Sequence, residues 1–304
     1  MSDKAPAEWD TTDQIAGLEP ARAQEMSMHE GLAVFVINLN SSKSRLEKIT
    51  RELHAKGVPF ERIEAVDGRR LPDPAKSVSP FRRVFRRMPL LPPTIGCWLS
   101  HKKVWEKIIA EKIPLSLVLE DDASPRVSFE ELASVDLNRS GLDLLRVHVL
   151  RDLSRVHALR PGETLRRDRM IGTGIFIAGR ELFLQTVPVF SATAYFLTLS
   201  GAQKLASRKK ILAPTDWFSL WGGFDGLRHG ILLPCMFDAD DGGVSTIQEH
   251  GEFPKTGIGW LARQDRRRVK LVKRYFLSYL DRRHARGLAG ELASRGLSAR
   301  PNRS

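Results

Sequence analysis

An apolar run that ends in three consecutive acids constrains the fold of this chain most. Residues 115–119 read Leu-Ser-Leu-Val-Leu, and Glu120, Asp121 and Asp122 follow directly. The apolar part is typical of a buried strand, whereas unpaired carboxylates are too costly to bury in a core. We therefore expect the acids at the carboxyl end of a strand, the edge where open α/β sheets bind ligands. The alternative is the acidic first turn of a helix, which the helix dipole favours.

The same three acids predict a metal site. Adjacent carboxylates repel one another, and a divalent cation relieves that repulsion. Mn²⁺ and Mg²⁺ prefer oxygen ligands and also bind phosphate oxygens. Glu120 and Asp122 are therefore the candidate ligands for Mn²⁺ or Mg²⁺.

The composition favours a globular domain inside the cell. With 42% apolar residues, the 304-residue chain can form a sizeable core. No apolar run approaches the length of a membrane span, and residues 1–30 lack the apolar segment of a signal peptide. Cys97 and Cys235 are too few for a disulfide framework and lack metal-ligand spacing. We expect a cytoplasmic protein.

The positive charge is concentrated at the C-terminus. Residues 263–304 hold thirteen Lys and Arg against three Asp and Glu, which accounts for about +10 of the net charge of +12. Val269, Val272, Phe276 and Tyr279 recur at spacings of three and four, which predicts a basic amphipathic helix. This helix either lies on an anionic membrane, at the inner face of the cell membrane, or packs on the main domain with a solvated basic face.

The pattern along the chain predicts an α/β sandwich. Residues 1–30 resemble a flexible leader, residues 31–255 form one domain, and residues 256–304 form the basic tail. The first strand, helix and second strand form a β-α-β unit, which needs a parallel pair. Alternation of strands and helices then indicates a mostly parallel sheet. The expected strands are 32–39, 60–64, 115–119, 142–148, 174–178, 195–199 and 231–237, and the expected helices are 42–56, one capped by Thr94, and 201–206.

Several motifs, in order over roughly residues 32–248, resemble those of glycosyltransferase family 25. The most specific pair is the Gly-Cys-x-x-Ser-His sequence of residues 96–101 and the Glu-Asp-Asp sequence of residues 120–122. The other motifs are Val36–Leu39 with Arg45, Ala65–Gly68, Ala194–Leu205, Pro214–Asp216 and Ser245–Ile247.

The resemblance implies a GT-A fold and transfer of a hexose from a UDP-sugar, typically galactose from UDP-galactose. The implied acceptor is a lipid-linked saccharide of lipopolysaccharide or another cell-surface glycan, and the expected reaction is metal-dependent and inverting. Related members glycosylate collagen. The resemblance also implies that donor-binding residues lie among Asn38, Arg45, Ser100, His101 and Asp121.

An inverting transfer needs a carboxylate that accepts the proton of the attacking hydroxyl. Asp216 is the first candidate, because Trp217 and Phe218 beside it suit a sugar-stacking surface; a helix N-cap is its alternative role. Asp225 is the second candidate, although its glycine-rich surroundings also suit an ordinary turn. His250 is a weaker candidate for a third metal ligand, as some GT-A enzymes use a late histidine.

Two other functions stay open on the sequence. A glycosyltransferase-like binding protein without catalysis would keep the fold, but the intact acids at 120–122 argue against it. A nucleic-acid-binding protein is suggested only by the basic charge, which is confined to the tail and one loop and accompanies no recognisable binding motif. We therefore expect no nucleic-acid partner.

Overall fold

A computed structural model describes residues 28–29, 31–80, 90–137, 140–149, 170–186, 189–239 and 272–295. Most of the expected leader, His250, residues 245–247 and the outer parts of the expected tail lie outside the described residues. Among the described residues, no helix is both long and apolar enough to cross a membrane.

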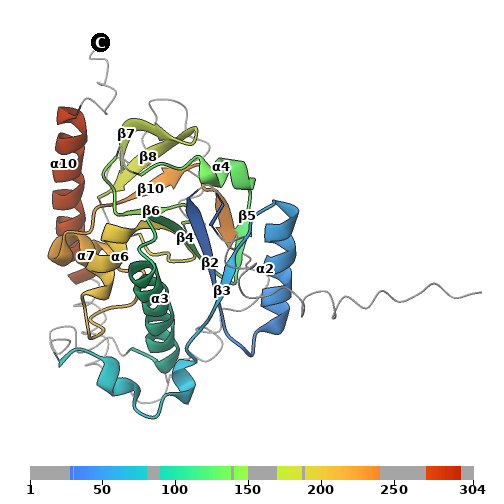
Figure 1. Cartoon of the computed structure of the whole chain (residues 1–304). Coiled ribbons are helices and arrows are strands. Elements are labelled where there is room, and N and C mark those ends of the chain that lie inside the picture. The colour runs from blue at the N-terminus through green and yellow to red at the C-terminus, as the bar shows by residue number, and fades with distance from the viewer. Residues whose placement is uncertain are drawn as a thin grey trace, which may run out of the picture.

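One large sheet forms the centre of the molecule (Figure 1). Its strands lie in the order β1-β2-β4-β9-β6-β10-β8-β7, and β3 also pairs with β2. A separate two-stranded sheet joins β5 and β11. The strands are β1 (Met28–His29), β2 (Leu32–Asn38), β3 (Glu61–Glu64), β4 (Leu115–Glu120), β5 (Ala123–Pro125), β6 (Leu144–Arg146), β7 (Met170–Ile177), β8 (Arg180–Gln185), β9 (Ala194–Thr198), β10 (His229–Leu233) and β11 (Phe237–Ala239).

The helices cover both faces of this sheet (Figure 1). One apolar cluster packs helices α2 and α10 against the sheet, and a second cluster packs α3, α6 and α7 against the opposite face. The helices are α2 (Lys43–Ala55), α3 (Pro92–Ala110), α4 (Phe129–Ala133), α6 (Leu199–Ala206), α7 (Phe218–Asp225) and α10 (Ser278–Ser294), with short 3₁₀ helices at Gly68–Arg70 and Pro74–Ser77 and a π-helical segment at Val272–Leu277.

The expected β-α-β opening is confirmed. Strand β2 pairs parallel with both β3 and β4, so Ile37 lies between Ile63 and Glu120 in register. The sheet as a whole is mixed: β6 and β10 also pair in parallel, whereas β1, β9, β8 and β7 pair antiparallel with their neighbours. The parallel group β3-β2-β4 is the part that places the three acids.

A hairpin forms one of the antiparallel pairs of the large sheet, β7 with β8. The turn between these strands holds Ala178 and Gly179 at φ values of +48° and +71°. Two consecutive positive φ values are typical of a tight hairpin turn, whose twist matches that of the strands. The sequence pattern predicted only the first of these strands, because a positive φ at Ala178 has no distinctive signature.

One expected detail of the helices is wrong. Helix α3 begins at Pro92 after Leu91, rather than at a cap formed by Thr94. Proline suits the first helical position because its missing N–H would be unpaired there in any case. In the tail, Phe276 and Tyr279 of the expected apolar stripe are exposed, and the residues buried on α10 are Ser278, Leu280, Asp281, Ala285, Leu288 and Leu292.

Candidate active site

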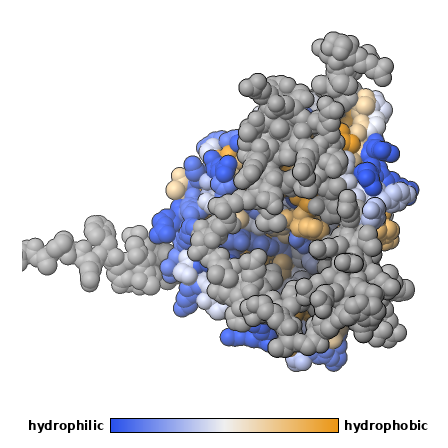
Figure 2. Space-filling view, turned by 180° about the vertical axis from the view of Figure 1, so that it is seen from behind, coloured by the Kyte–Doolittle hydropathy of each residue, from blue (hydrophilic) through white to orange (hydrophobic). Residues whose placement is uncertain are grey.

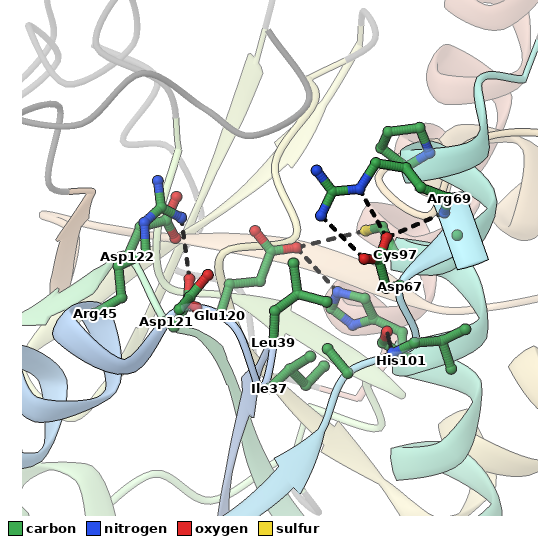
Figure 3. Close-up of a pocket in the computed structure, with 16 residues that line it drawn as sticks. Ile37, Leu39, Arg45, Asp67, Arg69, Cys97, His101, Glu120, Asp121 and Asp122 are labelled. Carbon is green, nitrogen blue, oxygen red and sulfur yellow. Dashed lines mark hydrogen bonds and ion pairs between the residues drawn. The ribbon is translucent and has the colours of Figure 1, made fainter. Parts of the chain in front are cut away.

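The carboxyl ends of the three parallel strands β3, β2 and β4 meet at one edge of the sheet, beside the first half of α3. A pocket opens there between the strand ends and the helix (Figure 3). Asp121, Asp122 and Arg45 lie on one side of Glu120 in this view, and the side chains from β3's loop and from α3 lie on the other. The charged and polar residues that line the pocket are Ser42, Arg45, Asp67, Arg69, Cys97, Ser100, His101, Glu120, Asp121 and Asp122.

Asp121 is tied to the first strand and helix. Its Oδ2 accepts a hydrogen bond from Asn38 Nδ2 at 2.8 Å, and its Oδ1 lies 3.1 Å from Arg45 Nη1. Asn38 also accepts a bond from Arg62, so its amide is oriented. Burial raises the pKa of Asp121, although Asn38 and Arg45 oppose that rise. The expected donor residues Asn38, Arg45 and Asp121 are therefore brought together, with Asn38 behind Asp121.

Asp122 has one carboxylate oxygen that no described residue satisfies. Its Oδ1 is buried and accepts no hydrogen bond from any described residue. Burial, together with the negative charges of Glu120 and Asp121, raises the pKa of Asp122 to about 7. A buried carboxylate that protein donors do not satisfy fits a bound cation, because an oxygen-liganded Mn²⁺ or Mg²⁺ would supply the missing positive charge. The residues present therefore fit the expected metal.

Glu120 stands at the end of a buried hydrogen-bond chain. Trp105 Nε1 donates to the Tyr195 hydroxyl at 3.1 Å, and that hydroxyl lies 2.8 Å from His101 Nδ1. His101 Nε2 lies 3.0 Å from Glu120 Oε1. Because Trp105 can only donate, every group is satisfied when the tyrosine donates to Nδ1 and Nε2–H donates to the carboxylate.

These hydrogen bonds fix the charge and the orientation of Glu120. Burial alone would raise the pKa of Glu120, but the hydrogen bond from His101 lowers it below its ordinary value. Glu120 therefore remains ionised, with one oxygen held by His101. His101 orients a carboxylate, which is more than the core role that a lone helical histidine usually has.

Cys97 forms a second group with the same two residues. The ligand atoms of Cys97, His101 and Glu120 lie within 4.8 Å of one another, a spacing at which three ligands could hold a metal. However, the His101 nitrogen in this group already donates to Glu120, and burial raises the pKa of the Cys97 thiol well above its ordinary value. We therefore favour Asp122 and Glu120 over this group as the ligands of a hard cation.

Ser100 has a structural role in the wall of the pocket. Its hydroxyl donates to Gly96 at 2.7 Å and accepts from the backbone N–H of Val66 at 2.8 Å. A Cβ added at Gly96 would come within 2.4 Å of the carbonyl oxygen of Val66. Helix α3 therefore packs directly on the loop that follows β3, and Ser100 bonds the two together.

The loop after β3 supplies two pocket residues, Asp67 and Arg69, that were not among the expected site residues. Arg69 forms two bonds with Asp67, Nε to Oδ1 at 2.8 Å and Nη2 to Oδ2 at 3.0 Å, and both residues line the pocket. The bond to Arg69 lowers the pKa of Asp67 against the effect of its burial. The parallel pair was itself a usable signal, because residues 65–69 follow β3 and the ends of parallel strands share one edge.

The two candidate bases are placed differently. Asp216 lies just before α7, and neighbouring Thr215 has its Oγ1 3.8 Å from the Cys97 sulfur. The charge of Asp216 contributes to the raised pKa of Cys97, so this carboxylate interacts electrostatically with a residue of the pocket wall. The N-cap residue of α7 is Trp217, and its side chain forms no cap hydrogen bond. Asp216 is therefore not the N-cap of this helix, which was its alternative role.

Asp225, like Asp216, is not among the residues that line the pocket. It lies at the end of α7 and accepts two bonds from Arg208, from Nε at 2.7 Å and from Nη2 at 2.8 Å. The Arg208 guanidinium also lies over the rings of Trp221 and Phe224. The bonds to Arg208 engage both carboxylate oxygens of Asp225, which makes it the weaker of the two candidate bases.

Comparison with known proteins identifies the family. Residues 32–218, more than half of the chain, match the model of glycosyltransferase family 25, described as LPS biosynthesis protein. The chain belongs to glycosyltransferase family 25. The match includes the pocket residues on β2, α2, α3 and β4, together with Asp216.

Family 25 relatives differ in their described activities. Procollagen galactosyltransferase 2 of Mus musculus is 25% identical over 72% of this chain and 33% of its own length. A probable inactive glycosyltransferase 25 family member 3 of Rattus norvegicus is 26% identical over 72% of this chain and 35% of its own length. The chain therefore spans about a third of the length of these relatives. Among solved structures, the crystal structure of A197 from STIV aligns at 12% identity with a TM-score of 0.35, over 68% of this chain and 83% of that one.

Proposed function

We propose that this family 25 member is a metal-dependent hexosyltransferase that uses a UDP-sugar, with UDP-galactose as the first candidate donor. The observation that carries the proposal is the buried, unpartnered oxygen of Asp122 beside the ionised Glu120. The repulsion of this buried carboxylate by Glu120 and Asp121 destabilises the metal-free protein. Such a group is explained if it holds a cation when the donor binds.

The pocket residues suit a nucleoside diphosphate. Asp122 and the second oxygen of Glu120 would hold Mn²⁺ or Mg²⁺. When bound, the cation supplies positive charge that stabilises the departing diphosphate. Arg45 and Arg69 lie on opposite sides of the acids and add two guanidinium groups, whose planar N–H donors suit phosphate oxygens (Figure 3). Asn38 and His101 contribute indirectly, because their hydrogen bonds orient Asp121 and Glu120.

The acceptor proposed is a saccharide of lipopolysaccharide or of another cell-surface glycan. The family description supports this choice, while the procollagen relatives support a protein-linked acceptor as the second candidate. For the first acceptor, we propose a cytoplasmic enzyme that meets lipid-linked saccharide at the inner face of the membrane. A binding protein without activity is the other candidate function, supported by the probable inactive relative.

One assay tests the transferase proposal against the inactive alternative. Purified protein is incubated with a panel of UDP-sugars, with Mn²⁺, with Mg²⁺ or with chelator, and released UDP is measured. We expect slow UDP release that requires the cation and is fastest with UDP-galactose. Binding of a UDP-sugar without release of UDP in any condition, with or without saccharide acceptors, would support the inactive binding protein.

Replacement of Asp216 tests the assignment of the base. Asp216→Asn keeps the shape of the side chain and removes its basicity, so we expect turnover to fall by roughly a hundredfold or more. The KM for the donor should change little, because the cation and the arginines bind the diphosphate. Turnover and donor KM are measured with one donor and one acceptor.

Asp225→Asn is the matched control for this test. It makes the same chemical change at the far end of α7, where the carboxylate of Asp225 accepts a hydrogen bond from Arg208. We expect a lower unfolding temperature with turnover per folded molecule retained. Loss of turnover in Asp225→Asn, with Asp216→Asn active, would reverse the assignment of the base.

A further inference from the structure

Exposed aromatic side chains gather at one corner of the molecule. Among the described residues, five large hydrophobic side chains are exposed, and four of them lie on α7, in the π-helical segment before α10 or at the start of α10. These four, here called the aromatic patch, are Phe224, Tyr275, Phe276 and Tyr279, with exposed fractions of 53%, 59%, 40% and 55%. Scattered single exposed apolar residues are normal, whereas a cluster of them indicates an interaction surface.

Close packing of two helices holds the patch together. The Leu280 side chain of α10 lies against Gly223 of α7, where an added Cβ would come within 2.8 Å of it. This contact brings Phe224 next to the start of α10, and the rings of Phe224 and Phe276 lie 6.4 Å apart. The patch is therefore built from two elements that are far apart in the sequence.

Arginines continue the same outer face of the helix. Arg282, Arg283 and Arg286 are exposed, and the positions 275, 279, 282 and 286 follow spacings of four, three and four. The only acid between 275 and 290 is Asp281, which is fully buried on the inner face. The outer face of α10 therefore carries aromatic rings followed by three positive charges, with no exposed negative charge among them.

The space-filling view (Figure 2) shows the same combination of apolar and charged side chains along α10. Seen from behind, hydrophobic and hydrophilic side chains lie next to one another on the edge of the molecule that α10 forms (Figure 2). In Figure 1 the helix lies along that edge, with its outer side turned away from the sheet.

We propose that the aromatic patch and these three arginines form a docking surface for an anionic lipid bilayer. Aromatic rings favour the membrane–water interface, and arginines reach anionic headgroups while their stems cover apolar surface. The positive charge of this surface favours an anionic bilayer, because such a bilayer offers an interface for the aromatic rings and negative headgroups for the arginines. The inference deepens the proposed function, because it names the surface that would bring the enzyme to a lipid-linked acceptor.

The surface differs from the one expected from sequence. The expected stripe included Phe276 and Tyr279, and both belong to the patch, but Phe224 comes from α7. Moreover, the helix is not an appendage: its inner face is part of the core and only its outer face is available. Docking would therefore place the whole domain against the bilayer along one edge.

The test uses the full chain and vesicles, without donor or acceptor. Co-sedimentation is measured with phosphatidylcholine vesicles that contain one third phosphatidylglycerol, and with pure phosphatidylcholine, at low and high salt. We expect binding to the anionic vesicles only, with salt weakening it because it screens the charges. Phe276→Ser combined with Tyr279→Ser, and separately Arg282→Gln, Arg283→Gln and Arg286→Gln together, should each weaken binding by about tenfold or more.

Two matched controls make the result specific. Phe176→Ser removes an exposed phenylalanine of β7, outside the patch, and Arg51→Gln with Lys56→Gln removes two exposed charges, one on α2 and one at its C-cap. Both should bind as wild type. Equal loss in these controls, or unchanged binding in both patch variants, would overturn the proposal.

Light scattering completes the test. Should wild type be a dimer that the Phe276→Ser, Tyr279→Ser variant converts to monomer, the patch is a contact between copies and the lipid proposal fails. Donor hydrolysis is measured in parallel on the same variants. Unchanged hydrolysis with lost vesicle binding separates this proposal from the proposed function, which depends on the pocket.

Discussion

Asp122→Asn is expected to abolish metal-dependent transfer while making the metal-free protein harder to unfold. In the wild type, the buried Asp122 carboxylate has no protein donor at Oδ1 and is repelled by Glu120 and Asp121. Removal of its charge relieves that repulsion, so the unfolding midpoint without metal should rise by about 2–4 °C for each kcal/mol gained. Removal of a metal ligand should lower turnover by about a thousandfold or more, since the cation contributes several kcal/mol to the transition state.

Thermal unfolding with and without Mn²⁺ measures both effects. Wild type should be stabilised by Mn²⁺, because a ligand that binds only the folded state raises its stability. Asp122→Asn should start from a higher midpoint and gain nothing from Mn²⁺. This readout does not depend on activity, so it tests the metal site even when the acceptor is unknown.

An exposed aspartate provides the control. Asp73→Asn removes a surface carboxylate that lies 3.8 Å from Lys76, and an exposed pair of this kind contributes little to stability. Its midpoint, Mn²⁺ response and turnover should match those of the wild type. If Asp122→Asn instead keeps its Mn²⁺ response and its turnover, the metal does not bind at Asp122, and the Cys97 group becomes the next candidate.

Asp281→Ala is expected to destabilise the whole domain, although Asp281 lies in the segment that the sequence identified as a tail. Asp281 Oδ1 accepts a bond from Gln185 Nε2 at 2.6 Å, and Gln185 Oε1 accepts one from the buried guanidinium of Arg146. Burial lowers the pKa of Arg146 to about 10, although the charges of Asp281 and Asp216 oppose that effect. Arg146 is thus a desolvated cation in the central sheet, and a helix from the C-terminus supplies one of its negative counter-charges.

The loss of one counter-charge leaves the other charge buried and poorly compensated. Such changes cost roughly 3–5 kcal/mol, which corresponds to a fall of about 10 °C in the unfolding midpoint for a domain of this size. The midpoint of Asp281→Ala is measured by calorimetry or circular dichroism. Asp281→Asn should be less severe, because its amide oxygen still accepts the bond from Gln185.

Glu291→Gln is the control on the same helix. Glu291 is partly exposed and bonds Arg228 and Arg295 at the surface, so its loss should lower the midpoint only slightly. Deletion of residues 278–304 should unfold the domain, since it also removes Ala285, Leu288 and Leu292 from the core. An active, folded truncation would show that α10 is dispensable.

The sequence by itself determined the part of the fold that local patterns encode. The apolar run before Glu120 predicted a strand whose acids lie at the sheet edge, and β4 confirms it. The opening β-α-β unit followed from strand and helix periodicity, and the parallel pairing of β2 and β3 confirms that as well. The Gly-Cys-x-x-Ser-His and Glu-Asp-Asp motifs identified the family, because their spacing is readable along one chain.

Only the tertiary structure decided which partners the polar side chains have. Asp216 and Asp225 looked alike in sequence, and only the fold places Arg208 against the second. The helical period allowed more than one apolar face for α10, and packing against β8 and α7 selected the one that carries Asp281. Periodicity depends on neighbours three or four residues apart, whereas these choices depend on contacts between residues 17 or more positions apart, which spacing along the chain does not encode.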